Sequence, residues 1–313
     1  MTPRWGDLPM TSGATTRIAD PELADWLASI QSQEYAAPSI SRAREKRSRP
    51  AGPEISVVRD EVLAAENAVP VPVRVYRHDA EKTRTTCVYV HGGAFVFGDL
   101  DSHDRACRRL AALGRIDVVA VDYRRAPEHP FPAAIDDVRT VLAAVRHSIG
   151  SDQPLGLAGD SAGALIAFSA AEAPDIAVDR LLMVNPNVDL TLSMPSVESW
   201  GTGWGLDARD LEWFVSKWAP TSAIRGSSTL DPLRRAPLAT PMTTIITSEY
   251  DPLRDEGLAL AEHLQRAGRL TRHHHLDGMV HGVINLDTVS PTARRWGDCF
   301  LTEFAEELIN SRG

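Results

Sequence analysis

The chain of 313 residues is 43% hydrophobic and 24% charged, and its formal net charge is −9. This length is enough for a large buried core and somewhat long for one compact sheet domain, so we expect an added lid. The acidic balance argues against a nucleic-acid partner, and the lack of any run of about 18 apolar residues argues against a membrane span. The three cysteines lack the spacing of metal ligands and the N-terminus lacks an apolar signal-peptide core, which together favour a reduced, cytoplasmic protein.

The first predicted element is a helix over residues 21–35, because apolar residues recur there at helical spacing. Asp20 stands directly before it and is a candidate N-cap. A basic cluster over residues 42–49 follows and ends in the turn-forming sequence PAGP at residues 50–53. We interpret this stretch as a solvated linker rather than a binding patch.

From residue 54 onward the pattern changes from helical to extended. Residues 55–59 and 71–76 are predicted as an antiparallel pair of strands that feeds a larger sheet. Six further apolar segments alternate with helices, and these predicted strands cover residues 87–90, 118–121, 155–158, 181–184, 244–247 and 272–276. The alternation predicts an α/β protein with a mostly parallel eight-stranded sheet flanked by helices, the last of them over residues 290–308.

The predicted strand at residues 87–90 leads into the glycine-rich sequence HGGAF at residues 91–95. Acyl transfer from an ester produces a tetrahedral oxyanion, which is stabilised by backbone N–H groups that already point at it. Adjacent glycines allow a loop to turn such groups inward. The candidate oxyanion donors are the N–H groups of Gly93, Ala94 and Ala162, although a glycine-rich turn without a catalytic role is the alternative.

The sequence GDSAG at residues 159–163 places Ser161 between two glycines, after a predicted strand and before an alanine-rich helix. This is the G-x-S-x-G pattern of a nucleophile elbow, in which the serine occupies a strained strand-to-helix turn and needs neighbours without bulk. The pentapeptide alone is a moderate signal, because such short patterns also occur by chance. The glycine-rich sequence upstream favours the catalytic interpretation, with Ser161 as the nucleophile.

Together with the sequence DYRRAPEHPFPA at residues 122–133, these two motifs resemble the bacterial hormone-sensitive-lipase-like branch of the α/β-hydrolases, over roughly residues 55–310. The resemblance implies an α/β-hydrolase fold with a helical cap over the active site. It divides the chain into an N-terminal cap segment and linker at residues 1–53 and a catalytic domain at residues 54–313, with a second cap segment at about residues 190–222. It also implies a serine esterase with no metal or organic cofactor.

One position departs from the family, which usually has a third glycine where this chain has Ala94. An alanine still donates its N–H group, but it resists a positive φ. We therefore expect Ala94 to adopt a negative φ and to serve the oxyanion without strain.

The acid of a catalytic triad is expected after the serine along the chain of this fold. Asp251 lies just past the strand predicted at residues 244–247, where α/β folds place their sites, and it matches the family's Asp-Pro-Leu-x-Asp motif. Glu249 and Asp255 are the competing carboxylates. Asp255 also fits the first turn of the next helix, where the helix dipole favours an acidic side chain.

His281 is the candidate base, because it follows Asp251 by 30 positions, which leaves room for one helix and one strand. It matches the family's His-Gly-Phe position, with Val283 in place of the aromatic residue. In the implied mechanism Ser161 attacks the carbonyl carbon, His281 takes the serine proton, and Asp251 holds the imidazole in the required tautomer.

Other charged and histidine residues have supporting interpretations. His91 and Gly92 are expected to shape the oxyanion loop, while Asp160 and Glu128 are expected to place charges near the elbow. The run of three histidines at residues 273–275 suggests a metal site, but alternation along a strand leaves only two imidazoles on one face, so no metal is predicted.

An insertion between the strands at residues 181–184 and 244–247 contains four of the chain's seven tryptophans. In relatives this segment joins the N-terminal helices in the cap, which implies an apolar acyl or alcohol pocket. The candidate pocket residues are Phe95, Trp204, Phe214 and Val283.

The sequence therefore predicts a serine carboxylesterase that acts on small esters of short to medium acyl chains, without a nucleic-acid or membrane partner. A lactone or N-acetyl hydrolase or an acyltransferase would use the same triad. A non-hydrolytic ligand-binding relative is a further alternative, which the presence of His281 disfavours. The oligomeric state is left open, with a homodimer as one option.

Overall fold

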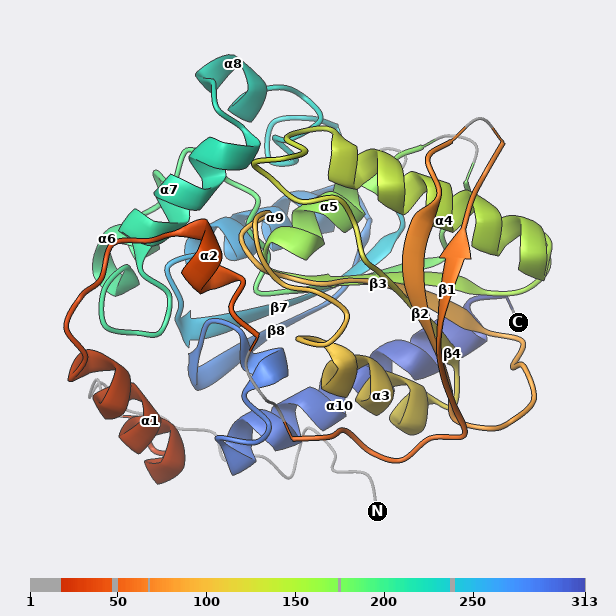
Figure 1. Ribbon diagram of the computed structural model, residues 1–313, viewed down its shortest axis with the longest axis horizontal. Helices are drawn as coiled ribbons and strands as arrows, with labels where there is room; N and C mark the ends of the chain where they lie inside the picture. Colours follow the sequence, from red (N-terminus) through yellow and green to blue (C-terminus); the bar gives the residue numbers. More distant parts are fainter. Residues whose placement is uncertain (1–17, 47–49, 67, 174–175, 237–239, 313) are drawn as a thin grey trace.

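The computed structural model of the protein describes residues 18–46, 50–66, 68–173, 176–236 and 240–312 (Figure 1). Its strands are β1 (Val57–Leu63), β2 (Val71–Arg77), β3 (Thr86–Val90), β4 (Asp117–Val121), β5 (Leu155–Asp160), β6 (Arg180–Val184), β7 (Met242–Tyr250) and β8 (Leu270–Val280). They form an eight-stranded sheet in the order β1-β2-β4-β3-β5-β6-β7-β8. Strand β2 pairs antiparallel with β1 and β4, and every pair from β4 to β8 is parallel.

Helices cover both faces of this sheet (Figure 1). One face carries α1 (Pro21–Gln31), α3 (Asp104–Gly114) and α10 (Pro291–Ile309), and the other carries α4 (Ala133–Ile149), α5 (Ala162–Ala171) and α9 (Arg254–Arg266). The shorter helices are α2 (Ile40–Ala43), α6 (Pro195–Trp200), α7 (Ala208–Trp218), α8 (Ser222–Arg225), η2 (Val283–Asn285) and η3 (Asn310–Arg312). Within the described ranges, no helix combines the length and the apolar character that crossing a membrane requires.

Side chains of the central strands alternate between two apolar clusters, one on each face of the sheet. In β3, Val88 and Val90 pack in the cluster of α4 and α5, whereas Cys87 and Tyr89 pack in that of α3 and α10. All residues of β3 and β4 are buried, as expected for parallel strands that are covered on both faces. Helix α5 is also buried along its whole length, so the sequence at its N-terminus is held in the interior.

The predicted fold class, a mostly parallel eight-stranded sheet with flanking helices, is confirmed. Each predicted strand is present, with ends that differ by a few residues. The largest differences are at β1, which ends at Leu63 rather than at residue 59, and at β8, which continues to Val280 where the sequence predicted a loop from residue 277 onward. The pairing of Val280 with Tyr250, after a register shift, keeps this part of the chain extended along β7.

Part of the basic cluster is fastened to the body of the molecule rather than solvated. Helix α2 begins this segment, and Arg44 follows it directly. Arg44 donates to the carbonyl oxygens of Val96 at 2.8 Å and Ala126 at 2.7 Å, and it pairs with Glu128 at 2.7 Å. The linker interpretation is therefore wrong for Arg44, whose guanidinium bonds to two backbone carbonyls and to Glu128 instead of lying in solvent.

Asp20 connects the beginnings of α1 and α10. The predicted N-cap is confirmed, since Asp20 Oδ1 accepts from the Leu23 N–H at 2.9 Å. Asp20 Oδ2 accepts from Ser290 Oγ at 2.6 Å and from the Thr292 N–H at 3.0 Å. Burial by itself would raise the pKa of Asp20, but these hydrogen bonds lower it below its ordinary value.

We expect Asp20→Ala to lower the free energy of unfolding by about 2 kcal/mol, because it removes the cap of α1 and leaves the donors of α10 unpaired. Since the pKa of Asp20 is lowered, its contribution is present above about pH 4 and is lost as the pH falls further. Denaturant unfolding at several pH values measures both effects. The exposed Ser32→Ala is the control and should change stability by less than about 0.5 kcal/mol. Equal stability of D20A and wild type at pH 7 would contradict this role.

Candidate active site

Ser161 stands at the turn between β5 and α5, with a φ of 53° and a ψ of −123°. Close backbone contacts require both glycines of the GDSAG sequence. A Cβ atom on Gly159 would lie 2.5 Å from the Gly163 carbonyl oxygen, and one on Gly163 would lie 2.2 Å from that of Val90. No side chain fits at such distances. The Ser161 N–H donates to the Val184 carbonyl at 2.9 Å, which ties the turn to the end of β6.

The structure brings Ser161, His281 and Asp251 together in one hydrogen-bonded line, which we call the Ser–His–Asp array. His281 Nε2 lies 3.0 Å from Ser161 Oγ, and His281 Nδ1 lies 3.0 and 3.1 Å from the two carboxylate oxygens of Asp251. Asp251 directly follows β7 and His281 directly follows β8. Because β5, β7 and β8 are parallel strands of one sheet, the residues that follow their carboxyl ends meet at the same edge.

The two competing carboxylates lie elsewhere. Glu249 Oε2 accepts from the Gly278 N–H at 2.7 Å, so this side chain fastens the end of β8 to β7. Asp255 Oδ2 accepts from the Ser196 N–H at 2.9 Å and thereby connects α9 to α6. Neither is within hydrogen-bond distance of His281, so the geometry favours Asp251 as the acid of the array.

The environment of His281 makes its imidazole a stronger base than usual. Burial by itself would lower the pKa of His281, because it disfavours the charged form. The negative charge of Asp251 and its hydrogen bond oppose this effect, and the charge of Asp160 adds to them. The net result is a His281 pKa above its ordinary value, which suits a group that accepts a proton.

The loop after β3 and the first residue of α5 together present three backbone N–H groups beside Ser161. The Gly93 carbonyl accepts from the N–H groups of Val96 and Phe97 at 2.9 Å, which closes a tight turn. Among the described residues, no hydrogen bond occupies the N–H groups of Gly93, Ala94 or Ala162. Such unpaired donors next to the serine are able to bind an oxyanion.

The conformation expected for Ala94 is wrong. Its φ is 46°, and the neighbouring Gly93 and Phe95 also have positive φ values, of 130° and 67°. The turn that closes on the Gly93 carbonyl imposes this left-handed conformation. The conformation is sterically unfavourable for an alanine, because its Cβ atom comes too close to the backbone. The loop therefore keeps a conformation suited to glycine while carrying an alanine.

Asp160 and His91 lie beneath this loop. Asp160 Oδ1 accepts from the Gly92 N–H at 3.0 Å and from the Tyr89 hydroxyl at 2.9 Å, while Oδ2 lies 3.2 Å from His103 Nε2. Burial lowers the pKa of His91 to about 3, so its ring is neutral and its Nδ1–H donates to the Gly92 carbonyl at 2.8 Å. The sequence reasoning did not identify His103, because an isolated histidine before a helix carries no distinguishing pattern.

Glu128 does not lie near the elbow, so that expectation is wrong. Its side chain is 54% exposed and pairs with Arg44, the residue that follows α2. The charge of Glu128 thus helps to attach the N-terminal segment to the molecule. An acidic residue in a motif gives no indication of which way its side chain points.

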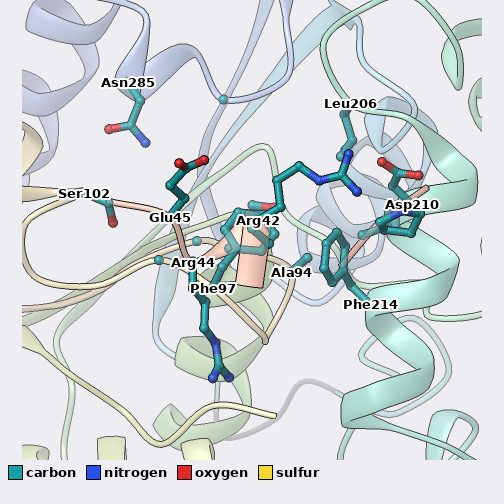
Figure 2. A pocket seen from close by; sticks show the side chains of 18 of the residues that line it. Arg42, Arg44, Glu45, Ala94, Phe97, Ser102, Leu206, Asp210, Phe214 and Asn285 are labelled. Carbon is teal, nitrogen blue, oxygen red and sulfur yellow. The ribbon is translucent and has the colours of Figure 1, made fainter. Parts of the chain in front are cut away.

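A cavity of about 910 Å³ opens over Ser161 and His281. One wall is largely apolar and carries Ala94, Phe97, Leu206, Leu211 and Phe214, together with the charged side chain of Asp210. Asp210, Leu211 and Phe214 belong to α7. The opposite side is polar and includes Glu45, Ser102, His103 and Asn285. Figure 2 shows Asn285, Ser102 and Glu45 on one side of this space and Leu206 and Phe214 on the other. The expected apolar pocket is therefore only one half of the cavity.

Of the four expected pocket residues, only Phe214 lines this cavity. Phe95 is fully buried and stacks on Trp218, with ring centroids 3.9 Å apart. Trp204 stacks on Tyr250 at 4.4 Å, and Val283 is fully buried. These three expectations are wrong, because each side chain packs into an apolar cluster. Residues close to them in the sequence line the cavity instead.

The three consecutive histidines alternate along β8 as the strand period requires. His273 Nε2 and His275 Nδ1 both contact Thr247 Oγ1, at 2.9 and 3.0 Å. His274 points the other way and contacts Glu303 at 2.6 Å. Across the part of the chain that the structure describes, no group of three or more histidine, cysteine, aspartate or glutamate residues is arranged to bind a metal ion.

Comparisons with known proteins agree with this geometry. Residues 87–285 match the model of a family described as alpha/beta hydrolase fold. The chain is 33% identical over 249 residues to an ethyl acetate hydrolase from Pseudomonas putida, a match that covers 75% of this chain and 78% of that protein. It is 34% identical over 265 residues to esterase LipI from Mycobacterium tuberculosis, which covers 80% of this chain and 82% of that protein.

A solved structure shows the same likeness in three dimensions. The hyperthermophilic esterase from the archaeon Pyrobaculum calidifontis superposes with a TM-score of 0.75 at 31% sequence identity. The match covers 82% of this chain and 86% of that chain. The likeness in fold therefore extends over most of the chain.

We expect Ala94→Gly to raise the free energy of unfolding by up to about 1 kcal/mol, because glycine adopts a φ of 46° without strain. We expect the loop to keep this conformation when a substrate binds, so the turnover rate should change little. Ala94→Val is the matched contrast and should destabilise by more than about 1 kcal/mol, since a β-branched residue fits a positive φ poorly. Thermal unfolding of the three proteins checks this order. A clear loss of stability in A94G would indicate a negative φ at this position.

Proposed function

This chain belongs to the hormone-sensitive-lipase-like carboxylic ester hydrolases of the α/β-hydrolase family, and we propose that it hydrolyses small esters of short to medium acyl chains through an acyl-enzyme on Ser161. The observation that supports this most is the Ser–His–Asp array, with its contacts of 3.0 Å on both sides of the imidazole. Its position beneath an open cavity gives a substrate access to the serine oxygen.

In the first half of the proposed reaction, Ser161 Oγ attacks the ester carbonyl carbon while His281 Nε2 takes the serine proton. The carbonyl oxygen becomes an oxyanion, for which the unpaired N–H groups of Gly93, Ala94 and Ala162 are the proposed donors. The Asp251 carboxylate stabilises the imidazolium that forms. His281 then gives its proton to the leaving alkoxide, and the acyl group stays on Ser161 as an ester.

In the second half, water takes the place of the alcohol. His281, now neutral again, accepts a proton from this water as it attacks the acyl carbon. The same N–H donors stabilise the second oxyanion, and collapse of that intermediate returns the proton from His281 to Ser161 Oγ. The products are the carboxylic acid and free enzyme, and no metal or organic cofactor enters either step.

The walls of the cavity support the proposed size of the acyl chain. The ring of Phe214 on α7 contacts the ring of Phe97 edge to face, with ring centroids 5.2 Å apart. These two rings limit the space along the apolar wall of the cavity. The volume of about 910 Å³ lies within the range of sites that bind small organic ligands. We propose that residues near α2 and α7 act together as a cap, because both segments line the cavity although they are far apart in the sequence.

We expect Ser161→Ala to lower ester hydrolysis by a factor on the order of a thousand or more while the protein stays folded. The serine hydroxyl contributes little to packing, since it faces the cavity. The assay uses activated esters from acetyl to dodecanoyl, together with a lactone and an N-acetyl substrate. Near wild-type turnover by S161A would exclude Ser161 as the nucleophile. Turnover of only the lactone or the N-acetyl compound would replace the proposed substrate class, and no turnover of any compound would favour a binding protein.

We expect Phe214→Ala to shift the preference toward acyl chains that are longer by roughly three methylene groups, because it removes a ring that limits the space for the acyl chain. The measurement is the ratio of kcat/KM for decanoyl and butyryl esters, which should rise about tenfold. Trp213→Phe on the same helix is the control, because Trp213 does not line the cavity. An unchanged ratio in F214A would place the acyl chain on the polar side instead.

A further inference from the structure

The segment that follows β6 contacts both the serine and the acid of the array. The Val184 carbonyl accepts from the Ser161 N–H at 2.9 Å, and the Asn187 N–H donates to the Ser161 carbonyl at 3.2 Å. Between these two contacts, Asn185 Nδ2 donates to Asp251 Oδ2 at 2.9 Å. Four consecutive residues thus fix the backbone of the serine and the carboxylate of the acid relative to each other.

Asn185 adopts a conformation that its local sequence disfavours. Its φ is 46°, and it stands directly before Pro186, where a residue normally takes an extended conformation. Strain of this kind persists only where the surroundings determine the conformation, and it is concentrated at functional sites. The side chain is 1% exposed, and its amide also donates to Ser248 Oγ at 2.9 Å, so its direction is fixed.

Asp251 depends on a small number of donors. It is fully buried, and a buried carboxylate is costly unless hydrogen bonds compensate for the lost water. The Leu253 N–H donates to Oδ1 at 2.8 Å, and His281 Nδ1 contacts both oxygens. Within the described part of the chain, Asn185 is the one side chain other than His281 that donates to this carboxylate.

We propose that Asn185 is a positioning residue, whose amide holds the Asp251 carboxylate against His281 while its backbone segment ties that carboxylate to Ser161. Asn185 does not line the cavity and acts through Asp251 alone. This inference rests on the proposed function, because it concerns the same three side chains.

The other titratable groups whose charges act on His281 and Asp251 are carboxyl groups, so a neutral donor such as the Asn185 amide holds Asp251 without adding charge. Asp160 at the end of β5 already adds negative charge near His281. On α9, burial raises the pKa of Glu256 above its ordinary value, and the nearby carboxylates of Asp189 and Asp251 raise it further. Glu256 Oε1 accepts from the N–H groups of Val188 at 2.5 Å and Asp189 at 3.1 Å, and the carboxylate of Asp189 lies in the same loop.

The first test is Asn185→Gly, because glycine keeps a φ of 46° without strain and removes only the amide. We expect kcat for p-nitrophenyl butyrate to fall about tenfold or more with KM within about twofold, since the cavity is untouched. A less firmly placed Asp251 raises the His281 pKa less. The acidic limb of the pH–rate profile should therefore move to lower pH, by about half a unit or more.

The second test is Asn185→Asp, which has the same shape and places a carboxyl group beside Asp251. Two buried carboxyl groups at hydrogen-bond distance do not both ionise, so the new group keeps its proton near neutral pH and donates as the amide did. We expect kcat close to wild type there, and a new loss of rate in alkaline solution as this group ionises.

Ser169→Ala is the matched control, because it removes a buried hydroxyl on α5 that donates to the Thr229 carbonyl at 2.9 Å, away from the array. It should keep the wild-type profile. Wild-type kcat with an unmoved acidic limb in N185G would overturn the proposal. The same holds if N185D is as slow as N185G at every pH.

A measurement without substrate separates this inference from the proposed function. The His281 imidazole is titrated by NMR in histidine-labelled protein and assigned by its loss in His281→Gln. A His281 titration at lower pH in N185G than in wild type supports the positioning role, and coincident titrations overturn it. If wild type hydrolyses no ester of the panel, the proposed function fails, while this titration still decides the role of Asn185.

Discussion

The site depends on one close contact between backbones. The first turn of α5 packs so tightly on the end of β3 that a Cβ atom on Gly163 would lie 2.2 Å from the Val90 carbonyl oxygen and 2.4 Å from that of His91. The turn that presents Ser161 and the loop that presents the N–H groups of Gly93 and Ala94 therefore share a contact surface. Any side chain at position 163 would move Ser161 Oγ away from the N–H groups of Gly93 and Ala94, the proposed oxyanion donors.

The buried carboxyl groups around this contact differ in the direction of their pKa shifts. Burial would raise the pKa of Asp160, but His103 and the Tyr89 hydroxyl lower it, so Asp160 remains an acceptor for the oxyanion loop. Burial also raises the pKa of Glu256, whose Oε1 accepts from the N–H groups of Val188 and Asp189. The carboxylates of Asp251 and Asp160 raise the basicity of the His281 imidazole against the effect of its burial.

The cavity is assembled from segments that are far apart in the sequence. Residues near α2 and residues of α7 both face the space above Ser161, and Arg44 attaches the first segment through Val96, Ala126 and Glu128. In this space Leu206 and Phe214 lie on one side together with Asp210, and Asn285, Ser102 and Glu45 lie on the other (Figure 2). Such a division suits an ester, whose acyl chain is apolar and whose reacting carbonyl group is polar.

The sequence by itself determined the fold class and the residues of the Ser–His–Asp array. Strand periodicity, the steric need for glycine at residues 159 and 163, and the order of the motifs are local properties that a linear chain records. The tertiary structure alone decided the positive φ of Ala94, the outward direction of Glu128 and the contact between Asn185 and Asp251. Each of these depends on groups that lie close in space but on separate strands or loops, and no local pattern encodes which way a side chain points once the sheet has formed.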